Sequence, residues 1–286
     1  MGFFQNLFGK KTCALCGKEC GMMHRTKVKN GEYVCSDCTS QCSKFVRLSR
    51  LTTDEVRGHI EYMRRQNRLF EEVFSTARRE RMPSQLDKEG IEFCDELGMF
   101  RIVSRQSRKC EELFRYDQVA SYEEYFEEDP PNEQRKEPKF KECGIKLHLV
   151  GSRKNAAEIR AGTRAHPYVQ DEIRVCFSSS NKKYAQDAHN AKCHFDYIFG
   201  VNDDRKGLFD FGMSKKEQRD LKAAVGMAKS FGTVFKAARE GGIEDSEELR
   251  AQMEENQRAV EDANTGGLAV YSRRADEAEA RINGEG

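Results

Sequence analysis

Hydrophobic residues recur with the 3.6-residue period of a helix over residues 51–82. Thr52 followed by Glu55 forms a capping-box pattern at the start of this stretch, and the apolar stripe continues to about Arg81. Pro83 then ends the pattern, because proline cannot continue a helix. Arginines and glutamates alternate on the polar face, which favours ion pairing along the helix over phosphate binding. The sequence therefore predicts one long connecting helix. Its apolar stripe consists of Val56, Ile60, Met63, Phe70, Val73, Phe74 and Ala77.

Beyond Pro83 the period of the apolar positions shortens towards two, as in β-strands. Ile145, Leu147 and Leu149 alternate with polar neighbours, which is typical of antiparallel strands with one buried and one solvated face. The proline-containing, charged stretch Glu127–Lys141 is predicted to be a flexible loop. Residues 83–200 are thus expected to form a β-rich domain with a terminal helix. The predicted strands are Gly98–Ser104, Glu112–Tyr116, Gln118–Tyr125, Gly144–Gly151 and Glu172–Ser178.

The C-terminal third of the chain carries two more helical patterns and an acidic end. One pattern spans Asn181–Phe199, and a second begins at Ser214 and defines a C-terminal helix within residues 201–240. Residues 241–286 hold few large apolar side chains and 12 acidic against 5 basic residues. We expect this tail to be disordered, with at most a fraying helix before the glycine pair at 266 and 267.

The extreme N-terminus, residues 1–11, combines apolar residues at helical spacing with a basic pair. Such a short amphipathic segment binds a membrane only weakly by itself, so packing on its own protein or fraying is the favoured interpretation. Association with a membrane surface remains an alternative. The residues concerned are Phe3, Phe4, Leu7, Phe8, Lys10 and Lys11.

The composition limits the size of the hydrophobic core and indicates the cellular compartment. Of 286 residues, 37% are hydrophobic and 34% charged, and there is no Trp, so the core is expected to occupy only part of the chain. No apolar run is long enough to span a membrane and no secretory signal is present, which predicts a cytoplasmic protein. Eleven cysteines, an odd number, favour metal binding and free thiols over a disulfide framework.

The cysteines provide the strongest chemical signal in the sequence. Cys13 and Cys16 form one C-x2-C pair, and Cys35 and Cys38 form another after an 18-residue spacer. Each pair can place two thiolates on one ion, and two pairs complete the closed tetrahedral site of structural zinc. Four-cysteine iron is the chemical alternative. The spacing predicts one structural Zn²⁺ in a module over residues 12–50.

Two further cysteines follow these pairs at a fixed offset. Cys42 lies four residues after Cys38 and is expected to be a small buried residue beneath the site. Cys20 is interpreted as a packing residue, with an alternative metal ligand or a redox thiol left open. A closed shell of four thiolates has no position for a reacting water, so the predicted ion is a scaffold.

The stretch from Cys13 to Leu51, with Cys-Gly-Lys at 16–18 and Tyr-Val-Cys-Ser-Asp-Cys at 33–38, resembles the zinc-binding domain of the ClpX unfoldases. This resemblance implies a treble-clef module that dimerises or docks partners, with Cys13, Cys16, Cys35 and Cys38 as ligands and Cys42 as a non-ligand.

Over a longer stretch the chain is similar to a bacterial family called domain of unknown function 4428. That family begins with a short Met-Gly-Phe/Leu-Phe segment, followed by the cysteine pairs, a helix and a small β-rich region. This resemblance implies a PH-like barrel or sandwich for the β-rich part and carries no assigned activity. The segments that carry it are 100–103, 113–116, 119–122 and 166–174.

The sequence lacks nucleotide-binding and hydrolase motifs, so no catalysis is predicted. His189, Cys193 and His194 form the most enzyme-like cluster, as a second metal site or a thiolate pair, but ordinary helix residues are the favoured interpretation. Tyr168 with Asp171 and Glu172 is interpreted either as an acidic edge or as a solvated strand entry.

The combined expectation is an α+β protein with a zinc module, a long helix, a small antiparallel β-rich domain and a C-terminal helix. We predict a non-catalytic zinc-binding adaptor that docks protein partners, with a homodimer as one arrangement. The alternative is a nucleic-acid-binding zinc-ribbon protein, because residues 1–52 contain 9 basic and 3 acidic residues.

Overall fold

The computed structural model describes residues 9–85, 89–103, 110–151, 161–168, 170, 172–201, 254, 257 and 267–284. These residues form a mixed helical and sheet structure with small antiparallel sheets, which confirms the coarse α+β prediction. The predicted helix beginning at Ser214, the first eight residues of the N-terminal segment, and Asp171 lie outside the described residues.

The N-terminal module consists of two small hairpins and one helical turn. Strand β1 (Lys11–Thr12) pairs with β2 (Glu19–Cys20), and β3 (Arg25–Lys27) pairs with β4 (Tyr33–Cys35). Helix α2 (Ser36–Thr39) follows directly. The buried residues of this module are mostly cysteines and valines and extend to the first turns of the next helix. Domains with so few buried side chains commonly need a bound metal or a disulfide for stability.

Helix α3 (Thr53–Glu72) begins with the predicted capping box, in which Thr52 and Glu55 each bond the other's backbone N–H. The predicted extension to about Arg81 is wrong. Val73 leaves the helical conformation at φ −123°, and a 3₁₀ turn at Phe74–Thr76 carries the fully buried Phe74 inward. The apolar stripe thus continues beyond the helix because these residues enter a core of their own.

The next seven strands form two antiparallel sheets. The first sheet has the order β5 (Glu80–Met82), β6 (Gly90–Cys94), β7 (Met99–Val103) and β8 (Leu113–Arg115). The second has the order β11 (Ile173–Ser178), β10 (Lys139–Leu149) and β9 (Val119–Asp129). The five predicted strands correspond to β7 to β11. Strands β5 and β6 were not predicted.

Strand β6 was not predicted, although Ile91, Glu92 and Phe93 alternate between apolar and polar residues. All five of its residues are buried, including Glu92, so the polar position of this short pattern does not mark a solvated face. The Glu92 carboxylate is compensated by Arg101 on β7 at 2.7 Å and by Arg81 on β5 at 3.3 Å. Cross-strand charge pairs therefore allow a glutamate inside the sheet.

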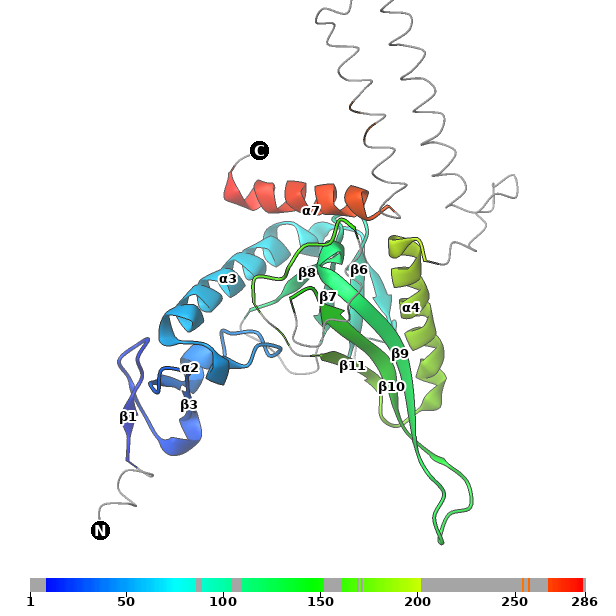
Figure 1. Ribbon diagram of the computed structural model, residues 1–286, viewed down its shortest axis with the longest axis horizontal. Coiled ribbons are helices and arrows are strands. Elements are labelled where there is room, and N and C mark those ends of the chain that lie inside the picture. The colour runs from blue at the N-terminus through cyan, green and yellow to red at the C-terminus, as the bar shows by residue number, and fades with distance from the viewer. Residues whose placement is uncertain are drawn as a thin grey trace, which may run out of the picture.

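The predicted loop at 127–141 is shorter than expected, because strands occupy both of its ends. Strand β9 continues to Asp129 and β10 begins at Lys139, so only residues 130–138 connect them. The resulting hairpin extends well beyond the body of the protein (Figure 1). Charged partners such as Lys141 and Glu127, 3.5 Å apart, support its two-stranded stem.

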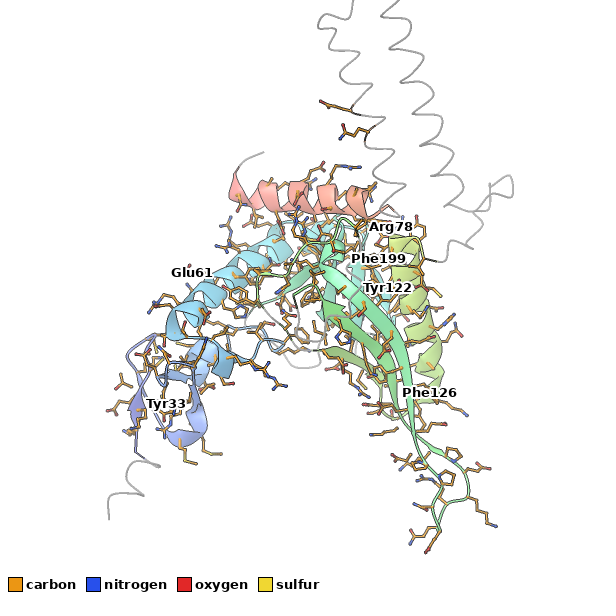
Figure 2. The ribbon with its side chains drawn as sticks, viewed as in Figure 1. Tyr33, Glu61, Arg78, Tyr122, Phe126 and Phe199 are labelled. Carbon is orange, nitrogen blue, oxygen red and sulfur yellow. The ribbon has the colours of Figure 1, made fainter. Side chains whose placement is uncertain are left out.

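Helix α4 (Ala185–Phe199) lies within the predicted helical stretch Asn181–Phe199 and covers the second sheet. Its Phe195 and Ile198 are fully buried in the main core between the two sheets. Tyr122 of β9 and Phe199 of α4 stack with ring centroids 5.5 Å apart, and both are labelled in Figure 2.

The final described element, α7 (Leu268–Asn283), corrects the prediction of a disordered tail over these residues. Leu268, Ala275 and Ala278 are buried at 1% exposure or less, where the helix packs against α3 and the first sheet (Figure 1). Because two of the contact residues are alanines, the helix lies close to its neighbours without a conspicuous hydrophobic pattern. None of the described helices is long and apolar enough to cross a membrane.

Candidate metal centre

The four predicted ligands are brought together by two tight backbone turns. In the first turn, Gly17 adopts φ +73° and donates its N–H to the Cys13 carbonyl at 2.9 Å. This conformation is readily available to glycine, which has no Cβ. The second pair begins at the end of β4, where Cys35 directly precedes α2 and Cys38 lies within it. The N–H of Ala14 reaches the carbonyl of Tyr33 at 2.8 Å and ties the two turns together.

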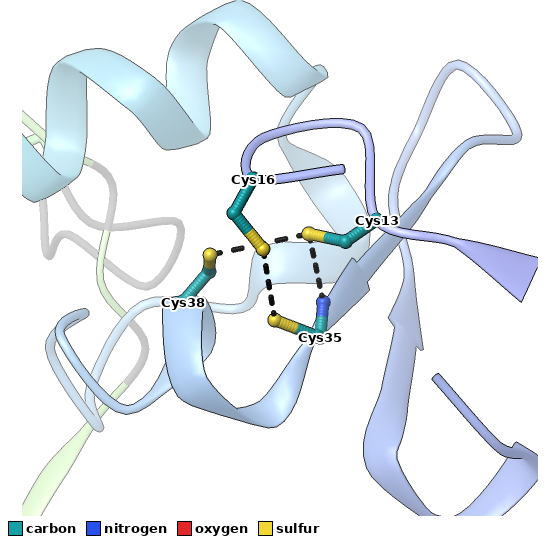
Figure 3. A group of neighbouring side chains, drawn as sticks. All are labelled: Cys13, Cys16, Cys35 and Cys38. Atoms are coloured by element: carbon teal, nitrogen blue, oxygen red, sulfur yellow. Dashed lines mark hydrogen bonds between the residues drawn. The ribbon is translucent and has the colours of Figure 1, made fainter. Parts of the chain in front are cut away.

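The four sulfur atoms converge on one point (Figure 3). All of them lie within 4.8 Å of one another. The Sγ atoms of Cys13 and Cys38 are 3.9 Å apart, and those of Cys16 and Cys35 are 3.6 Å apart. A Zn–S bond of about 2.3 Å requires a tetrahedral S–S edge of about 3.8 Å. The thiolate donor set and its spacing therefore fit a zinc ion held by Cys13, Cys16, Cys35 and Cys38.

Burial and hydrogen bonding act differently on the thiols of this cluster. Burial tends to raise the pKa of Cys13, but backbone donors, first among them the N–H of Cys35 at 3.3 Å, lower it to about 6. Burial raises the pKa of Cys38. The site thus contains one thiol prepared to bind as a thiolate, and a bound cation would favour the charged form of all four.

The arrangement of the four cysteines suits a structural metal and not a catalytic one. Three of the ligands are buried and Cys16 is exposed, so the centre lies at the edge of the module's small core. Four protein sulfurs complete a tetrahedral shell and leave no position for water or substrate. When bound, the ion would cross-link the two turns and fold the module.

The two additional cysteines of the module are packing residues. Cys42 is buried, and its Sγ lies 3.9 Å from the Cys38 carbonyl, beyond the end of the one-turn helix α2. Burial raises the pKa of the Cys42 thiol to about 12. Cys20 is also buried and donates to the Lys11 carbonyl at 3.1 Å. Neither belongs to the group of sulfurs that could share the ion.

The second predicted cluster divides into two separate contacts. His194 is buried, and its Nε2 lies 2.9 Å from an Asp95 carboxylate oxygen. His189 is on the exposed side of α4, with its Nε2 3.5 Å from the Cys193 sulfur. Within the described residues these three side chains do not form a metal-binding group. The ring of Tyr168 packs against that of His59 with centroids 4.3 Å apart, and Asp171, which belongs to the predicted acidic edge, lies outside the described residues.

The sequence analysis missed a polar junction between the metal module and the β-rich domain. Ser43 donates its hydroxyl to Glu112 at 2.5 Å and its backbone N–H to the Nε2 of His59 at 3.1 Å. The side-chain amide of Gln170 donates to a carboxylate oxygen of the same Glu112 at 3.2 Å. The hydroxyl oxygen of Tyr62 lies 3.2 Å from Nε2 of His166. The available signal was His59 itself, a polar residue between Val56 and Ile60 on the apolar stripe of α3.

The part of the chain that contains the cysteine cluster matches a known family. Residues 12–59 match the model of a family described as Domain of unknown function (DUF4428). The resemblance to that family is confirmed over this range. The matched stretch contains both cysteine pairs, the two hairpins and the start of α3, up to the His59 that contacts Ser43. The comparisons with curated proteins and with solved structures found no match.

Proposed function

We propose that this protein is a non-catalytic, cytoplasmic adaptor in which a zinc-stabilised DUF4428 module and a PH-like domain present surfaces to protein partners. The observation that carries the proposal is the four-cysteine cluster, whose sulfurs approach within 4.8 Å and complete a tetrahedral shell by themselves. A metal held in this way supports a surface and does not activate a substrate.

The arrangement of small elements supports a treble-clef description of the module. One cysteine pair sits on a turn between β1 and β2, and the second pair joins the β3–β4 hairpin to helix α2. A zinc ion shared by the first cysteine turn and by the start of α2 would tie together segments that are too short to bury a core of their own.

The order of strands supports a PH-like description of the second domain. A four-stranded antiparallel meander is followed by a three-stranded one, and α4 then packs across the second sheet. Scaffolds of this kind place binding residues on loops around a rigid core. The proposed function is the presentation of such surfaces.

The contacts between the metal module and the β-rich domain support a function that uses both. Besides the hydrogen bonds of Ser43, the ring of Phe45 packs edge-on against Phe114 of β8 with centroids 5.8 Å apart. These partially buried contacts join the segment after the zinc ligands to the first sheet. A partner that binds the module would therefore meet it in a fixed orientation relative to the β-rich domain.

The test compares full-length protein with a Cys35→Ser, Cys38→Ser variant and a matched Cys20→Ser control. We expect about one zinc per chain in the wild type and the control by elemental analysis, and loss of zinc in the double variant. Affinity capture from cytoplasm should recover the same protein partners with the wild type and the control but not with the double variant. Partners that are indifferent to zinc, or only nuclease-sensitive material, would overturn the adaptor role of this module.

A further inference from the structure

Helix α4 lies against β9 (Figure 1). A cysteine and a histidine of α4 and a carboxylate of β9 form a continuous chain of contacts at this place. The Sγ of Cys193 is 3.5 Å from Nε2 of His189, one helical turn earlier. Nδ1 of the same imidazole is 3.1 Å from a carboxylate oxygen of Glu124 on β9. The side chains of His189 and Glu124 are 53% and 41% exposed, so small solutes can reach the group.

The chemistry of the three groups fixes the direction of the hydrogen bonds. An ionised carboxylate only accepts, so Nδ1 of His189 carries the proton that is donated to Glu124. In the neutral imidazole, Nε2 is then an acceptor, and the thiol of Cys193 donates to it. A base oriented by a carboxylate and bonded to a nucleophile is the arrangement that activates a thiol.

The neighbouring charges are compatible with a thiolate at this position. Lys192 adjoins Cys193, and its ammonium is paired with Asp196 at 2.7 Å. Asp196 also accepts from the hydroxyl of Tyr122 at 2.8 Å, which holds this carboxylate on the buried side of α4. Of these charged groups, Lys192 interacts electrostatically with Cys193, and Glu124 acts through His189.

We propose that Cys193 is a reactive thiol that undergoes exchange with low-molecular-weight disulfides. His189 takes the proton of the Cys193 thiol, and the thiolate attacks one sulfur of the small disulfide. A new S–S bond forms at Cys193 while the original S–S bond breaks, and the departing thiolate takes the proton from His189. The disulfide supplies the oxidising equivalent, and the reaction leaves one mixed disulfide and one free small thiol.

Cys176 is a suitable internal reference for this reactivity. It lies half-buried on β11, and burial raises the pKa of its thiol. A thiol bonded to a base can give up its proton as it attacks, whereas an unassisted thiol at neutral pH reacts only through its small thiolate fraction. The expected net advantage of Cys193 over Cys176 at pH 7 is about tenfold.

The experiment treats full-length, zinc-loaded protein with oxidised glutathione and follows each cysteine by peptide-resolved mass spectrometry. We expect Cys193 to react about tenfold faster than Cys176 at about pH 7. His189→Asn should slow Cys193 about tenfold and leave Cys176 unchanged, while Glu124→Gln should produce a smaller loss. A control change at the exposed His24, His24→Asn, should alter neither rate.

The pH dependence distinguishes activation from simple exposure. In His189→Asn the rate at Cys193 should rise about tenfold per pH unit between about pH 6 and 8, as for an unassisted thiol, whereas the wild-type rate should rise less steeply. Thermal unfolding of each variant verifies that the fold is retained. Equal rates at Cys193 and Cys176, or a wild-type profile as steep as that of His189→Asn, would overturn the proposal.

Discussion

The close packing of α7 makes a specific prediction about Gly98, which lies in the turn between β6 and β7. Gly98 adopts φ +63°, and a Cβ at this position would overlap the carbonyl oxygen of Tyr271 and lie 2.8 Å from its carbonyl carbon. The obstructing atoms are helix backbone, so no side-chain rotation relieves the overlap. We expect Gly98→Ala to displace α7 from the first sheet.

The magnitude follows from two contributions. A non-glycine residue in the left-handed conformation costs about 1–2 kcal/mol, and forcing an extra carbon into a packed contact costs about 1–3 kcal/mol. Gly98→Ala should therefore destabilise the packed state by about 2–5 kcal/mol. Gly284→Ala is the matched control, because Gly284 has φ +75° and a Cβ added there would meet no other atom within 4 Å. That variant should lose only the conformational contribution.

The assay is amide hydrogen exchange across α7, with limited proteolysis as a second measure. In Gly98→Ala the amides of residues 268–283 should lose protection, while those of β9 and β10 keep theirs. In Gly284→Ala only the last turn of α7 should exchange faster. Wild-type protection of α7 in Gly98→Ala, or equal loss in both variants, would refute the argument that α7 is held by close backbone contact.

Three further predictions concern the metal, a buried ion pair and the pH dependence of stability. Chelation of zinc should remove on the order of 10 kcal/mol from the module, so exchange protection should vanish over residues 12–50 and persist in α4. Arg115→Met leaves Asp117, whose side chain is fully buried, without its nearer guanidinium partner at 2.8 Å, while the Arg164 guanidinium stays 3.8 Å away. We expect about 3–5 kcal/mol of destabilisation in urea unfolding, against less than about 1 kcal/mol for the half-exposed Arg164 changed to Met. Burial lowers the pKa of His59 and of His166 to about 4. Because the unfolded histidines bind protons below about pH 6.5, stability should be complete above that pH and fall as the pH drops to about 4, on the order of 3 kcal/mol for each histidine. In His59→Asn, the free energy of unfolding measured in urea should depend less on pH. An unchanged pH dependence would contradict the assignment of this effect to His59.

The sequence alone determined the features whose causes are local. The four clustered cysteines could be named because each C-x2-C turn is built within a few residues, and the spacing alone decides that two sulfurs can reach one ion. The start of α3 could be placed because Thr52 and Glu55 satisfy each other's backbone donors. Strands β10 and β11 could be predicted because one face of each strand is solvated, which leaves an alternating pattern of apolar and polar residues in the sequence.

The tertiary structure decided the features that depend on distant partners. Helix α3 ends at Glu72 because Phe74 is buried in a separate core that includes Ala275, about two hundred residues further along the chain. Helix α7 shows little apolar signal of its own and is held by the backbone around Gly98 and by Arg115, which reaches Asp276 at 2.7 Å. Sequence patterns report the burial of a segment's own face, whereas these contacts arise only when the folded chain brings separate segments together.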